Sequence, residues 1–277
     1  MAKIIKKSDL APAVFELVLE APRIARRRQP GQFVIVRVAD VGERIPLTIA
    51  DADPEKGTIT LVVQAVGLST KMMSTLGPGD ELLDVAGPLG KATEIETLGT
   101  VVGVGGGLGI APLYPIVERF HDTGNTVITI LGARSKSHLI YEDRMKAVSD
   151  RVLVATDDGS QGHKGFVSDS LTDLLNEGVP VDRVVAIGPV PMMQAVANVT
   201  REYDIPTVVS LNPVMLDGTG MCGGCRVSVG DDQFFACIDG PEFDGHLVDF
   251  GELANRQRMY RNDEECAVRD MDVEVGS

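Results

Sequence analysis

The first part of the chain alternates apolar and polar residues with a period of two, which is the pattern of strands that bury one face. The clearest alternating runs are 15–20, 32–38 and 58–64. Proline and glycine residues that favour turns separate these runs, and a short segment with helical spacing follows at 69–76. Several short strands with one brief helix predict a small antiparallel β-barrel, to which we assign residues 1–97.

The pattern changes after Gly99, where short and wholly apolar runs alternate with segments of helical spacing. The apolar runs are 100–104, 126–131, 152–155 and 184–187, and the helical segments are 111–121, 143–148, 168–175 and 191–203. Buried strands that alternate with helices form parallel sheets. Residues 98–210 therefore predict a doubly wound α/β domain, and residues 211–277 form a small cysteine-containing lobe with a polar tail.

The composition of the chain limits the kinds of partner it can bind and the compartment in which it is expected. The 277 residues carry a formal net charge of −14, which opposes binding to nucleic acid or to an anionic membrane surface. No run reaches the ~20 apolar residues of a membrane span, and the lysines near the N-terminus are not followed by the apolar stretch of a signal peptide. We expect a cytoplasmic protein with reduced cysteines and with no nucleic-acid or membrane partner.

Three of the four cysteines lie in or just after a glycine-rich stretch. It runs Asp217-Gly-Thr-Gly-Met-Cys222-Gly-Gly-Cys225, and Cys237 follows. A cysteine in the first position would complete the C-x4-C-x2-C…C spacing that holds a plant-type [2Fe–2S] cluster. Cysteines three residues apart can hold one iron, and glycines let backbone N–H groups approach the sulfurs. We predict a cluster with four ligands, Asp217, Cys222, Cys225 and Cys237, that is, three thiolates and one carboxylate.

The same cysteines are open to other interpretations. With His246 or Cys266 they could form a structural zinc site, because a C-x2-C pair suits zinc equally well. Cys266 is also the alternative to Asp217 as the fourth cluster ligand, although its place in the polar tail favours a packing role. A disulfide framework is disfavoured, because four cysteines in 277 residues would cross-link very little of the chain.

A second glycine-rich turn, Gly105-Gly-Gly-Leu-Gly-Ile-Ala-Pro112, lies between an apolar run and a helical segment. At such a turn a pyrophosphate can be bound by the N–H groups that begin the helix. The turn does not match G-x-G-x-x-G, and the next apolar run ends at Arg134 without an acidic residue, so the standard dinucleotide fingerprint is absent. A tight turn without a ligand is the alternative. An arginine at position 134 leaves both NAD and NADP open, since it can bind a 2′-phosphate.

Taken together, the motifs resemble those of the ferredoxin–NADP reductase-like flavoproteins. They are Pro46-Leu-Thr48, Val66-Gly-Leu-Ser-Thr70, Gly106-Gly-Leu-Gly-Ile-Ala-Pro112, Gly188-Pro-Val-Pro-Met-Met193 and the cysteine run, spread over about residues 5–265. The resemblance is closer to the iron–sulfur electron-transfer subunit of dihydroorotate dehydrogenase. It is closest to the small subunit of the electron-bifurcating NADH-dependent ferredoxin:NADP oxidoreductase and the related sulfide dehydrogenase subunit, because Asp217 stands where the dihydroorotate subunit has cysteine.

The resemblance implies which residues contact the cofactors. Those implied to bind FAD are Pro46, Leu47, Thr48, Val62, Val63, Gln64, Gly67, Ser69 and Thr70. Those implied to bind NAD(H) are Gly105, Gly106, Gly107, Gly109, Ile110, Ala111, Pro112, Arg134, Gly188, Pro189 and Met192. The reductases usually have an arginine three residues before the threonine, where this chain has Ile45. Arg44 stands one position early and is left unassigned.

On this basis we predict an electron-transfer subunit that carries NAD(H), FAD and a [2Fe–2S] cluster. No side chain is assigned a catalytic role, because the cofactors carry the chemistry. The expected partner is a larger subunit with flavin and [4Fe–4S] clusters, in a heterodimer or heterotetramer. The alternatives are the electron-transfer subunit of dihydroorotate dehydrogenase, a stand-alone NAD(P)H–ferredoxin reductase and a zinc-binding adaptor. The sequence leaves open whether the complex bifurcates electrons and which acceptor is terminal.

Overall fold

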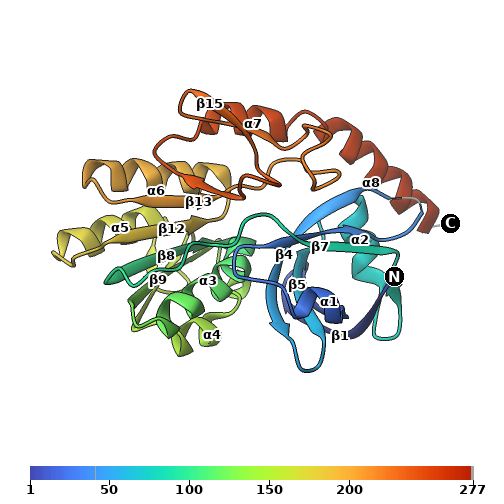
Figure 1. Ribbon diagram of the computed structural model, residues 1–277, viewed down its shortest axis with the longest axis horizontal. Helices are drawn as coiled ribbons and strands as arrows, with labels where there is room; N and C mark the ends of the chain where they lie inside the picture. The colour runs from blue at the N-terminus through green and yellow to red at the C-terminus, as the bar shows by residue number, and fades with distance from the viewer. Residues whose placement is uncertain (41, 276–277) are drawn as a thin grey trace.

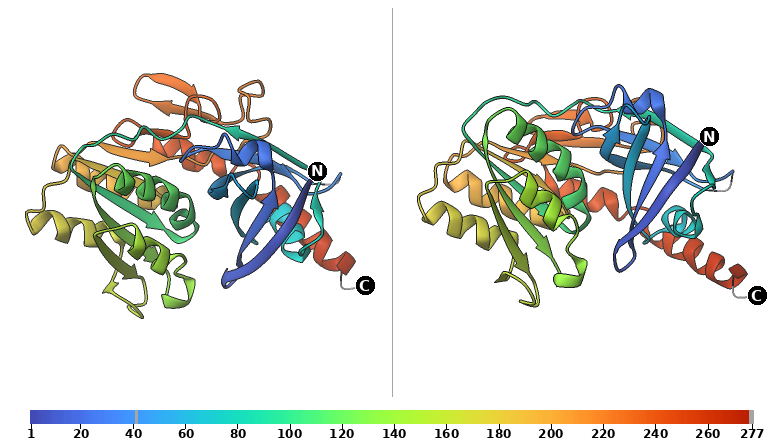
Figure 2. Two further views of the ribbon diagram at one scale, coloured as in Figure 1. Left: turned by 60° about the horizontal axis from the view of Figure 1, so that its bottom comes forward. Right: turned by 90° about the horizontal axis from the view of Figure 1, so that it is seen from below.

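The computed structural model describes residues 1–40 and 42–275 of the chain. Two sheets lie side by side, and the cysteine-containing lobe lies along one side of both (Figure 1). The N-terminus and the last helix lie at the barrel end of the molecule (Figure 2). No helix among the described residues is both long enough and apolar enough to cross a membrane.

The first sheet is antiparallel and nearly closes into a barrel, as predicted. Its strands are β1 (Ala2–Ala11), β2 (Val14–Glu20), β3 (Phe33–Arg37), β4 (Arg44–Asp53), β5 (Thr58–Gln64), β6 (Glu81–Leu82) and β7 (Asp84–Leu89). Their spatial order is β6-β1-β2-β5-β4-β3-β7. Alternate residues such as Leu17, Leu19 and Leu61 are fully buried inside the barrel, as the period-two pattern requires. Two helices accompany the barrel, α1 (Pro22–Ala25) and α2 (Leu68–Thr75).

The second sheet is the predicted doubly wound sheet. It contains β8 (Thr100–Gly106), β9 (Thr126–Ala133), β10 (Arg151–Thr156), β11 (His163–Lys164), β12 (Arg183–Ile187), β13 (Thr207–Ser210) and β16 (Glu242–Asp244). The order is β11-β10-β9-β8-β12-β13-β16, and only β16 is antiparallel to its neighbour. This strand comes from the range assigned to the cysteine lobe, so the lobe is joined to the edge of the sheet.

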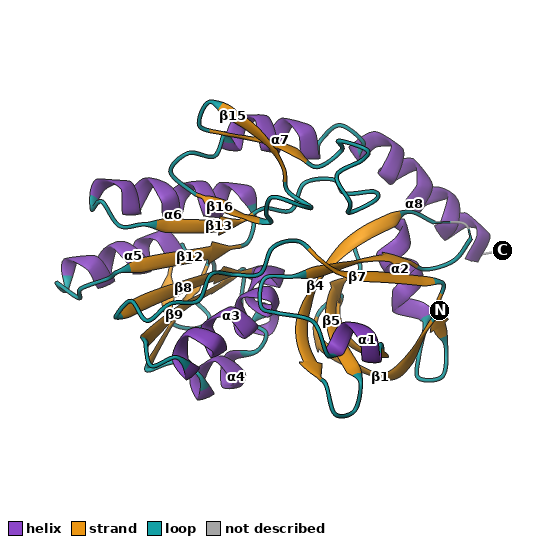
Figure 3. Ribbon diagram, in the orientation of Figure 1, coloured by secondary structure: helices purple, strands orange, loops and turns teal. Residues whose placement is uncertain are grey.

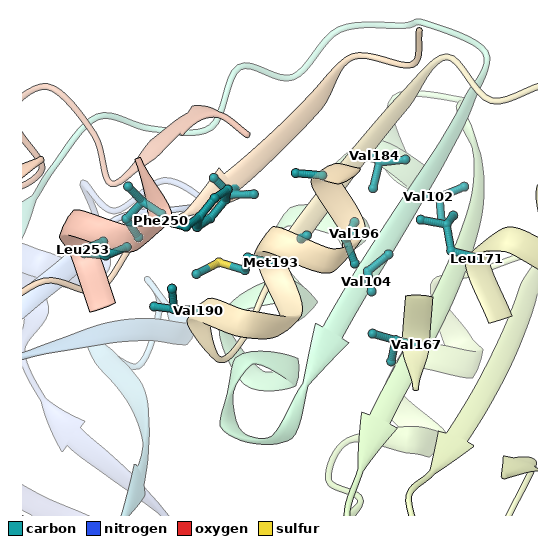
Figure 4. Close-up of a cluster of buried hydrophobic side chains, with 14 of the residues drawn as sticks. Val102, Val104, Val167, Leu171, Val184, Val190, Met193, Val196, Phe250 and Leu253 are labelled. Atoms are coloured by element: carbon teal, nitrogen blue, oxygen red, sulfur yellow. The ribbon is translucent and has the colours of Figure 1, made fainter. Parts of the chain in front are cut away.

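Helices cover both faces of the second sheet (Figure 3). They are α3 (Ile110–Asp122), α4 (Glu142–Ala147), α5 (Val167–Asn176) and α6 (Val190–Glu202), with short 3-10 turns η1 (Gly107–Gly109) and η2 (Lys136–His138). The pair α3 and α4 covers one face, and the pair α5 and α6 covers the other. Figure 4 shows the core of the second face, where Val102, Val104 and Val184 of the strands meet Leu171 of α5 and Val196 of α6.

Besides β16, the lobe contains a two-stranded hairpin and two helices. They are β14 (Arg226–Val229), β15 (Asp232–Phe235), α7 (Phe250–Gln257) and α8 (Arg261–Val275). The segment expected to be a polar tail is therefore largely helical, and α8 packs against α2 of the barrel (Figure 1). One core cluster continues from the nucleotide domain into the lobe and includes Phe33 and Ile35 of the barrel, so the lobe is packed on both sheets.

Candidate functional site

Strand β4 carries three of the residues predicted to bind FAD: Pro46, Leu47 and Thr48. It pairs with β3 in unbroken register over this whole segment. Because side chains alternate along a strand, Pro46 and Thr48 share one face, whereas Leu47 packs against the barrel core. Arg44 is exposed. By the same alternation it lies on the face of Pro46, opposite to Ile45, the position at which the related reductases have their arginine.

The start of α2 carries Gly67, Ser69 and Thr70, which the family resemblance implies to bind FAD, and the two hydroxyls have partners within the protein. Thr70 Oγ1 accepts hydrogen bonds from the N–H groups of Val66 and Gly67, both at 3.0 Å. The buried Ser69 Oγ accepts from the Glu43 N–H at 3.2 Å. The hydroxyls therefore shape the loop. The capacity to bind an anion lies in the N–H groups of the first helical turn, which lack carbonyl partners within the helix.

The strand predicted to line the flavin touches the turn predicted to bind the nucleotide. On β5, Val62 and Val63 are buried and Gln64 is half-buried. Val62 packs in one cluster with Ala111 of α3, and β5 contacts η1 directly. The two predicted cofactor sites are therefore neighbours.

The two segments predicted to bind NAD(H) meet where the sheet reverses its strand order, between β8 and β12. Ligands of doubly wound sheets bind at such points. A Cβ on Gly109 would overlap the carbonyl oxygen of Ile187, and a Cβ on Gly106 would overlap the sulfur of Met192. Only glycine permits the approach of Gly109 to the Ile187 backbone, whereas the Met192 side chain near Gly106 is flexible. The turn holds Gly105, Gly106, Gly107, Gly109, Ile110, Ala111 and Pro112, and the segment that begins α6 holds Gly188, Pro189 and Met192.

Arg134 directly follows β9 at the same carboxyl edge of the sheet and is exposed. Its carbonyl accepts a hydrogen bond from the Asp158 N–H at 3.3 Å. The Asp158 carboxylate in turn accepts bonds from the Ser160 hydroxyl at 2.6 Å and the Ser160 N–H at 2.9 Å, which lower the pKa of Asp158. Asp158 is thus tied to its own turn, and the group that this strand end offers to a ribose or phosphate is the Arg134 cation.

The cysteine loop directs backbone N–H groups at its own ligand atoms. The Asp217 carboxylate accepts from the N–H groups of Thr219 at 2.9 Å and Cys222 at 2.8 Å, and these bonds lower the pKa of Asp217. The Cys237 N–H donates to Cys225 Sγ at 3.5 Å. Burial and the neighbouring Cys225 raise the pKa of Cys237 to about 12. Two adjacent buried thiols would be unfavourable as bare thiolates, so a cationic metal group would relieve their repulsion.

The thiols and the carboxylate of this loop are the ligand types that an iron–sulfur cluster needs, but their side chains are not yet grouped around one point. Among the described residues no three His, Cys, Asp or Glu side chains are already grouped as metal ligands. Cys225 and Cys237 are buried and Cys222 is exposed. Gly218, directly after Asp217 in the loop, has a φ of +74°, a conformation that favours glycine. N–H groups directed at sulfur tune clusters in this class of site.

Cys266 lies elsewhere. It is exposed on α8, the helix that packs against α2, and its sulfur accepts a hydrogen bond from Arg269 Nη2 at 3.2 Å. The prediction that Cys266 is a packing residue is therefore wrong, because the last helix turns this side chain to solvent. Asp217 has the contacts with the loop that Cys266 lacks among the described interactions.

The cysteine loop rests on the barrel next to the predicted flavin strand. A Cβ on Gly218 would lie 2.6 Å from Leu89 Cδ1 and 2.9 Å from Ile35 Cγ1. Ile35 of β3 is paired directly with Pro46 of β4. The order across the molecule is therefore predicted nucleotide turn, predicted flavin strands and cysteine loop, an order that no local sequence pattern indicates.

Two family models match the chain. Residues 104–198 match the oxidoreductase NAD-binding domain, and residues 212–249 match the iron–sulfur cluster binding domain of dihydroorotate dehydrogenase B. The homolog of the dihydroorotate dehydrogenase B (NAD(+)) electron transfer subunit from Thermotoga maritima is 48% identical, covering 96% of this chain and 93% of that protein. The corresponding electron transfer subunit from Fusobacterium nucleatum is 35% identical, covering 85% of this chain and 92% of that protein.

Solved structures of similar proteins point to the same two domains. The structure of an NADH-dependent reduced ferredoxin-NADP oxidoreductase matches with a TM-score of 0.93 and 46% identity, covering 98% of each chain. Phthalate dioxygenase reductase, at 16% identity and a TM-score of 0.61, shares the fold over 90% of this chain and 97% of its own. Fold and site together define an electron-transfer oxidoreductase of the ferredoxin–NADP reductase-like class. The chain belongs to the family of FAD- and NAD-binding proteins in this class that carry the iron–sulfur domain of dihydroorotate dehydrogenase B.

Proposed function

We propose that this chain is the NAD(H)-, FAD- and [2Fe–2S]-containing electron-transfer subunit of a larger flavin and iron–sulfur complex. The observation that carries the proposal is the contiguity of the three candidate sites. The nucleotide turn touches β5, and the cysteine loop packs on β3, which pairs with β4. A flavin held along β4 and β5 would therefore lie between a nucleotide and a cluster.

The chain's own residues would hold FAD along two strands and at one helix start. The proposed set is Pro46, Leu47, Thr48, Val62, Val63, Gln64, Gly67, Ser69 and Thr70. We add Arg44 as a cation for the FAD phosphates, because it shares the face of Pro46 and follows Glu43, whose N–H bonds Ser69 at the start of α2. Bound FAD would accept a hydride and release single electrons, which is the chemistry that links a nicotinamide to an iron–sulfur cluster.

The nucleotide is proposed to be NAD(H), bound at the reversal of the parallel sheet. The proposed contacts are Gly105, Gly106, Gly107, Gly109, Ile110, Ala111, Pro112, Gly188, Pro189 and Met192, with Arg134 at the ribose end. The relatives named above are described as NAD(+)- or NADH-dependent, which supports NAD(H) over NADP(H). Asp217, Cys222, Cys225 and Cys237 are the proposed ligands of the [2Fe–2S] cluster.

The larger partner is proposed to carry flavin and [4Fe–4S] clusters, in a heterodimer or heterotetramer that bifurcates electrons. Support comes from the similarity to an oxidoreductase whose structure was determined in a study of flavin-based electron bifurcation. The loop itself adds a physical reason. Leu216 and Met221, the neighbours of Asp217 and Cys222, are exposed apolar side chains, which a bound partner would cover.

A second candidate is the electron-transfer subunit of dihydroorotate dehydrogenase. It is favoured by the 212–249 domain match and by the 35% identical relative of that name. The presence of Asp217 in the first ligand position argues for the bifurcating complex instead. The two candidates differ in a direct assay, because only the second would oxidise dihydroorotate when the complex is supplied with NAD⁺.

The proposed function is tested by anaerobic rapid mixing of the purified, coloured protein with NADH or NADPH. We expect absorbance from both flavin and cluster, and reduction of the flavin at least about 10-fold faster by NADH, since a 2′-phosphate must be met by a dedicated cation. Arg134→Ala should raise the Kd of NADH, because it removes a ribose-end contact, and should leave the limiting rate of flavin reduction within about threefold. Faster reduction by NADPH would make Arg134 a 2′-phosphate ligand and refute the NAD(H) assignment. A flavin-only spectrum would favour a simple reductase, and a colourless protein with bound zinc would favour an adaptor.

A further inference from the structure

The barrel and the nucleotide domain meet where α3 contacts β4. Beside this contact, five side chains from both domains form one connected group, which we term the interdomain clamp: Glu16, Asp51, Tyr114, Tyr141 and Arg144. Glu16 and Asp51 belong to barrel strands β2 and β4. Tyr114 belongs to α3, and the other two lie at and just inside the start of α4. None of the five is among the residues proposed to bind a cofactor.

Arg144 is the centre of the clamp. Its guanidinium carbon lies 4.0 Å from the centre of the Tyr114 ring and 4.6 Å from that of the Tyr141 ring. Its Nη2 donates to one carboxylate oxygen of Asp51, and Arg28 approaches the other oxygen at 3.7 Å. Arginine suits this position because a flat guanidinium can stack on aromatic rings and bond a carboxylate at the same time.

Tyr141 makes a second bond across the same interface. Its hydroxyl donates to Glu16 Oε2 at 2.6 Å, and the side chain is only 9% exposed. Burial and the bond to Glu16 raise the pKa of Tyr141 well above its usual value, which keeps the hydroxyl protonated as a donor. The backbone φ of Tyr141 is +58°. A bulky residue adopts this left-handed conformation only where its surroundings hold it there, so the fold maintains strain at the residue that makes the contact.

The clamp joins the elements that carry the two proposed cofactor sites. Asp51 lies on β4, close beyond Thr48 in the sequence, and Glu16 is directly opposite Val62 across the β2–β5 pair. On the other side, Tyr114 lies in the second turn of α3, whose start is the nucleotide turn. A shift of α3 and α4 relative to β4 and β5 would therefore move the nucleotide relative to the flavin.

We propose that Arg144 and Tyr141 are positioning residues that fix the nicotinamide against the flavin for hydride transfer. This inference rests on the NAD(H)–FAD function proposed above. In that reaction a hydride leaves C4 of NADH and bonds to the flavin ring, leaving NAD⁺ and the two-electron-reduced flavin. Its rate depends on alignment, and a misplacement of about 1 Å can slow such a step about 100-fold. Because the clamp residues lie outside both binding motifs, loosening the clamp lowers the rate and leaves cofactor affinity nearly unchanged.

The test uses the FAD-loaded protein, purified with any subunit that accompanies it, and rapid mixing with NADH. Arg144→Gln is expected to lower the limiting rate of flavin reduction about 10- to 100-fold while the Kd of NAD⁺ changes less than about threefold. Tyr141→Phe removes only the hydroxyl bond to Glu16, and its expected loss is about 3- to 10-fold. This variant keeps the native packing, so it decides alone if Arg144→Gln does not fold.

Amide hydrogen exchange gives a second readout that does not require turnover. Residues 50–53 of β4 and 142–147 of α4 are expected to exchange at least about 10-fold faster in Arg144→Gln, because local opening becomes easier when an interface contact is removed. Arg151→Gln is the matched control. It removes an exposed arginine that pairs with Glu177 at 2.6 Å within the nucleotide domain, and it should equal the wild type in both measurements.

The outcomes separate the clamp from the function on which it rests. An unchanged reduction rate in the clamp variants refutes the positioning role, whether or not exchange is faster. Loss of NAD⁺ or FAD affinity as the main effect also refutes it, as does a slower rate without faster exchange. If NADH does not reduce the flavin of the wild-type protein, the proposed function fails first, and the positioning role falls with it.

Discussion

At the scale of single residues, Asp217 combines two roles in the cysteine loop. Its two oxygens accept the N–H groups of Thr219 and Cys222, so it closes the loop on itself. The same bonds lower its pKa and keep it ionised at neutral pH. An ionised carboxylate near two buried thiols is unfavourable unless a positive group shares the site, and its negative charge contributes to the raised pKa of Cys237.

The ligand assignment predicts a pattern of single substitutions. Cys222→Ala, Cys225→Ala and Cys237→Ala should each abolish the cluster and leave FAD bound, because the flavin residues lie on the barrel. Asp217→Cys should retain a [2Fe–2S] cluster with an altered spectrum and potential, since thiolate is the softer ligand. The measurements are iron content and the visible and electron paramagnetic resonance spectra.

The matched control for this series is Cys266→Ala, which removes the exposed thiol on α8. Its cluster spectrum and iron content should equal those of the wild type. Loss of the cluster in Cys266→Ala, together with an intact cluster in Asp217→Ala, would contradict the assignment and make Cys266 the fourth ligand.

Features of single residues could be predicted from sequence where they depend only on neighbouring positions in the chain. The spacing of Asp217, Cys222 and Cys225 predicts one loop, and the glycines before Pro112 predict one turn. Contacts between distant residues leave no such trace. Tyr141 and Glu16 are 125 positions apart, and nothing in either local pattern indicates that they meet across two domains.

At the scale of elements, strands with a clear period-two pattern were predicted, and the lysine-rich strand β1 was not. In β1 the lysine-rich segment obscures the pattern, yet the Lys7 ammonium donates to the Leu76 carbonyl at 2.9 Å and lies 4.9 Å from the centre of the Phe15 ring. Strand β1 is therefore stabilised by partners that lie far along the chain. The C-terminal helix α8 is mostly polar in sequence, and its contact with α2 could not be inferred from local spacing.

Strand β16 links three parts of the molecule through one partly buried acid, Glu242. Its carboxylate accepts a 2.6 Å hydrogen bond from the hydroxyl of Thr93 in the segment between the two sheets. Both residues line a cavity of about 280 Å³. Burial raises the pKa of Glu242 to about 7. The bond from Thr93 and the charge of Arg183 act against this shift, and Glu94 adds to it.

This raised pKa predicts how stability depends on pH. The unfolded chain releases the Glu242 proton near 4.5 and the folded protein near 7, so the folded state binds more protons between these values. Stability therefore falls as pH rises from about 4.5 through about 7. Glu242→Gln should remove this term, raising the free energy of unfolding at pH 8 by roughly 2 to 4 kcal/mol with little change at pH 4.5. Urea unfolding at both pH values measures it.

Other charged residues near Glu242 do not affect this comparison. Lys91, Asp239 and Asp244 line the same cavity, and they remain in both proteins, so the difference between wild type and Glu242→Gln isolates one carboxyl. Glu81→Gln changes an exposed glutamate on β6 and should leave the pH dependence unaltered. An identical slope between pH 5 and 8 in Glu242→Gln and wild type would show that Glu242 ionises normally in the folded protein.

At the scale of the whole molecule, the barrel and the doubly wound sheet could be predicted because each has its own periodicity. The relative placement of the three parts could not, since it depends on side chains that meet only after folding. Phe33 and Ile35 of the barrel share a core cluster with Cys225 and Cys237, and this shared core sets the cysteine loop beside the flavin strands. In the proposed electron path, the end away from the nucleotide turn is the surface around the exposed Cys222.

That surface predicts where a partner binds. Met221 is 89% exposed, and Leu216 and Ile238 are 49% and 42% exposed. Ile238 packs over Gly220 of the loop, and Leu216 and Met221 directly precede Asp217 and Cys222; we call these three exposed apolar side chains the rim of the loop. Exposed apolar side chains next to a candidate redox site are typical of a protein–protein interface, because a partner that covers them removes apolar surface from water. The chain should therefore co-purify with a larger flavoprotein, and Met221→Asp should weaken that association at least about 10-fold, or about 1.4 kcal/mol.

The measurement is the Kd of the recombined subunits, with the cluster spectrum taken on the same samples to show that the loop is intact. Phe166→Asp is the control, since Phe166 is 67% exposed but lies in the nucleotide domain, directly before α5. It should bind the partner like the wild type, because the same apolar-to-charged change is made away from the rim. Equal Kd values for Met221→Asp and the wild type would place the partner on another face, whereas full physiological turnover by the isolated chain would show that no partner is required. In either case the exposed rim would need a different explanation.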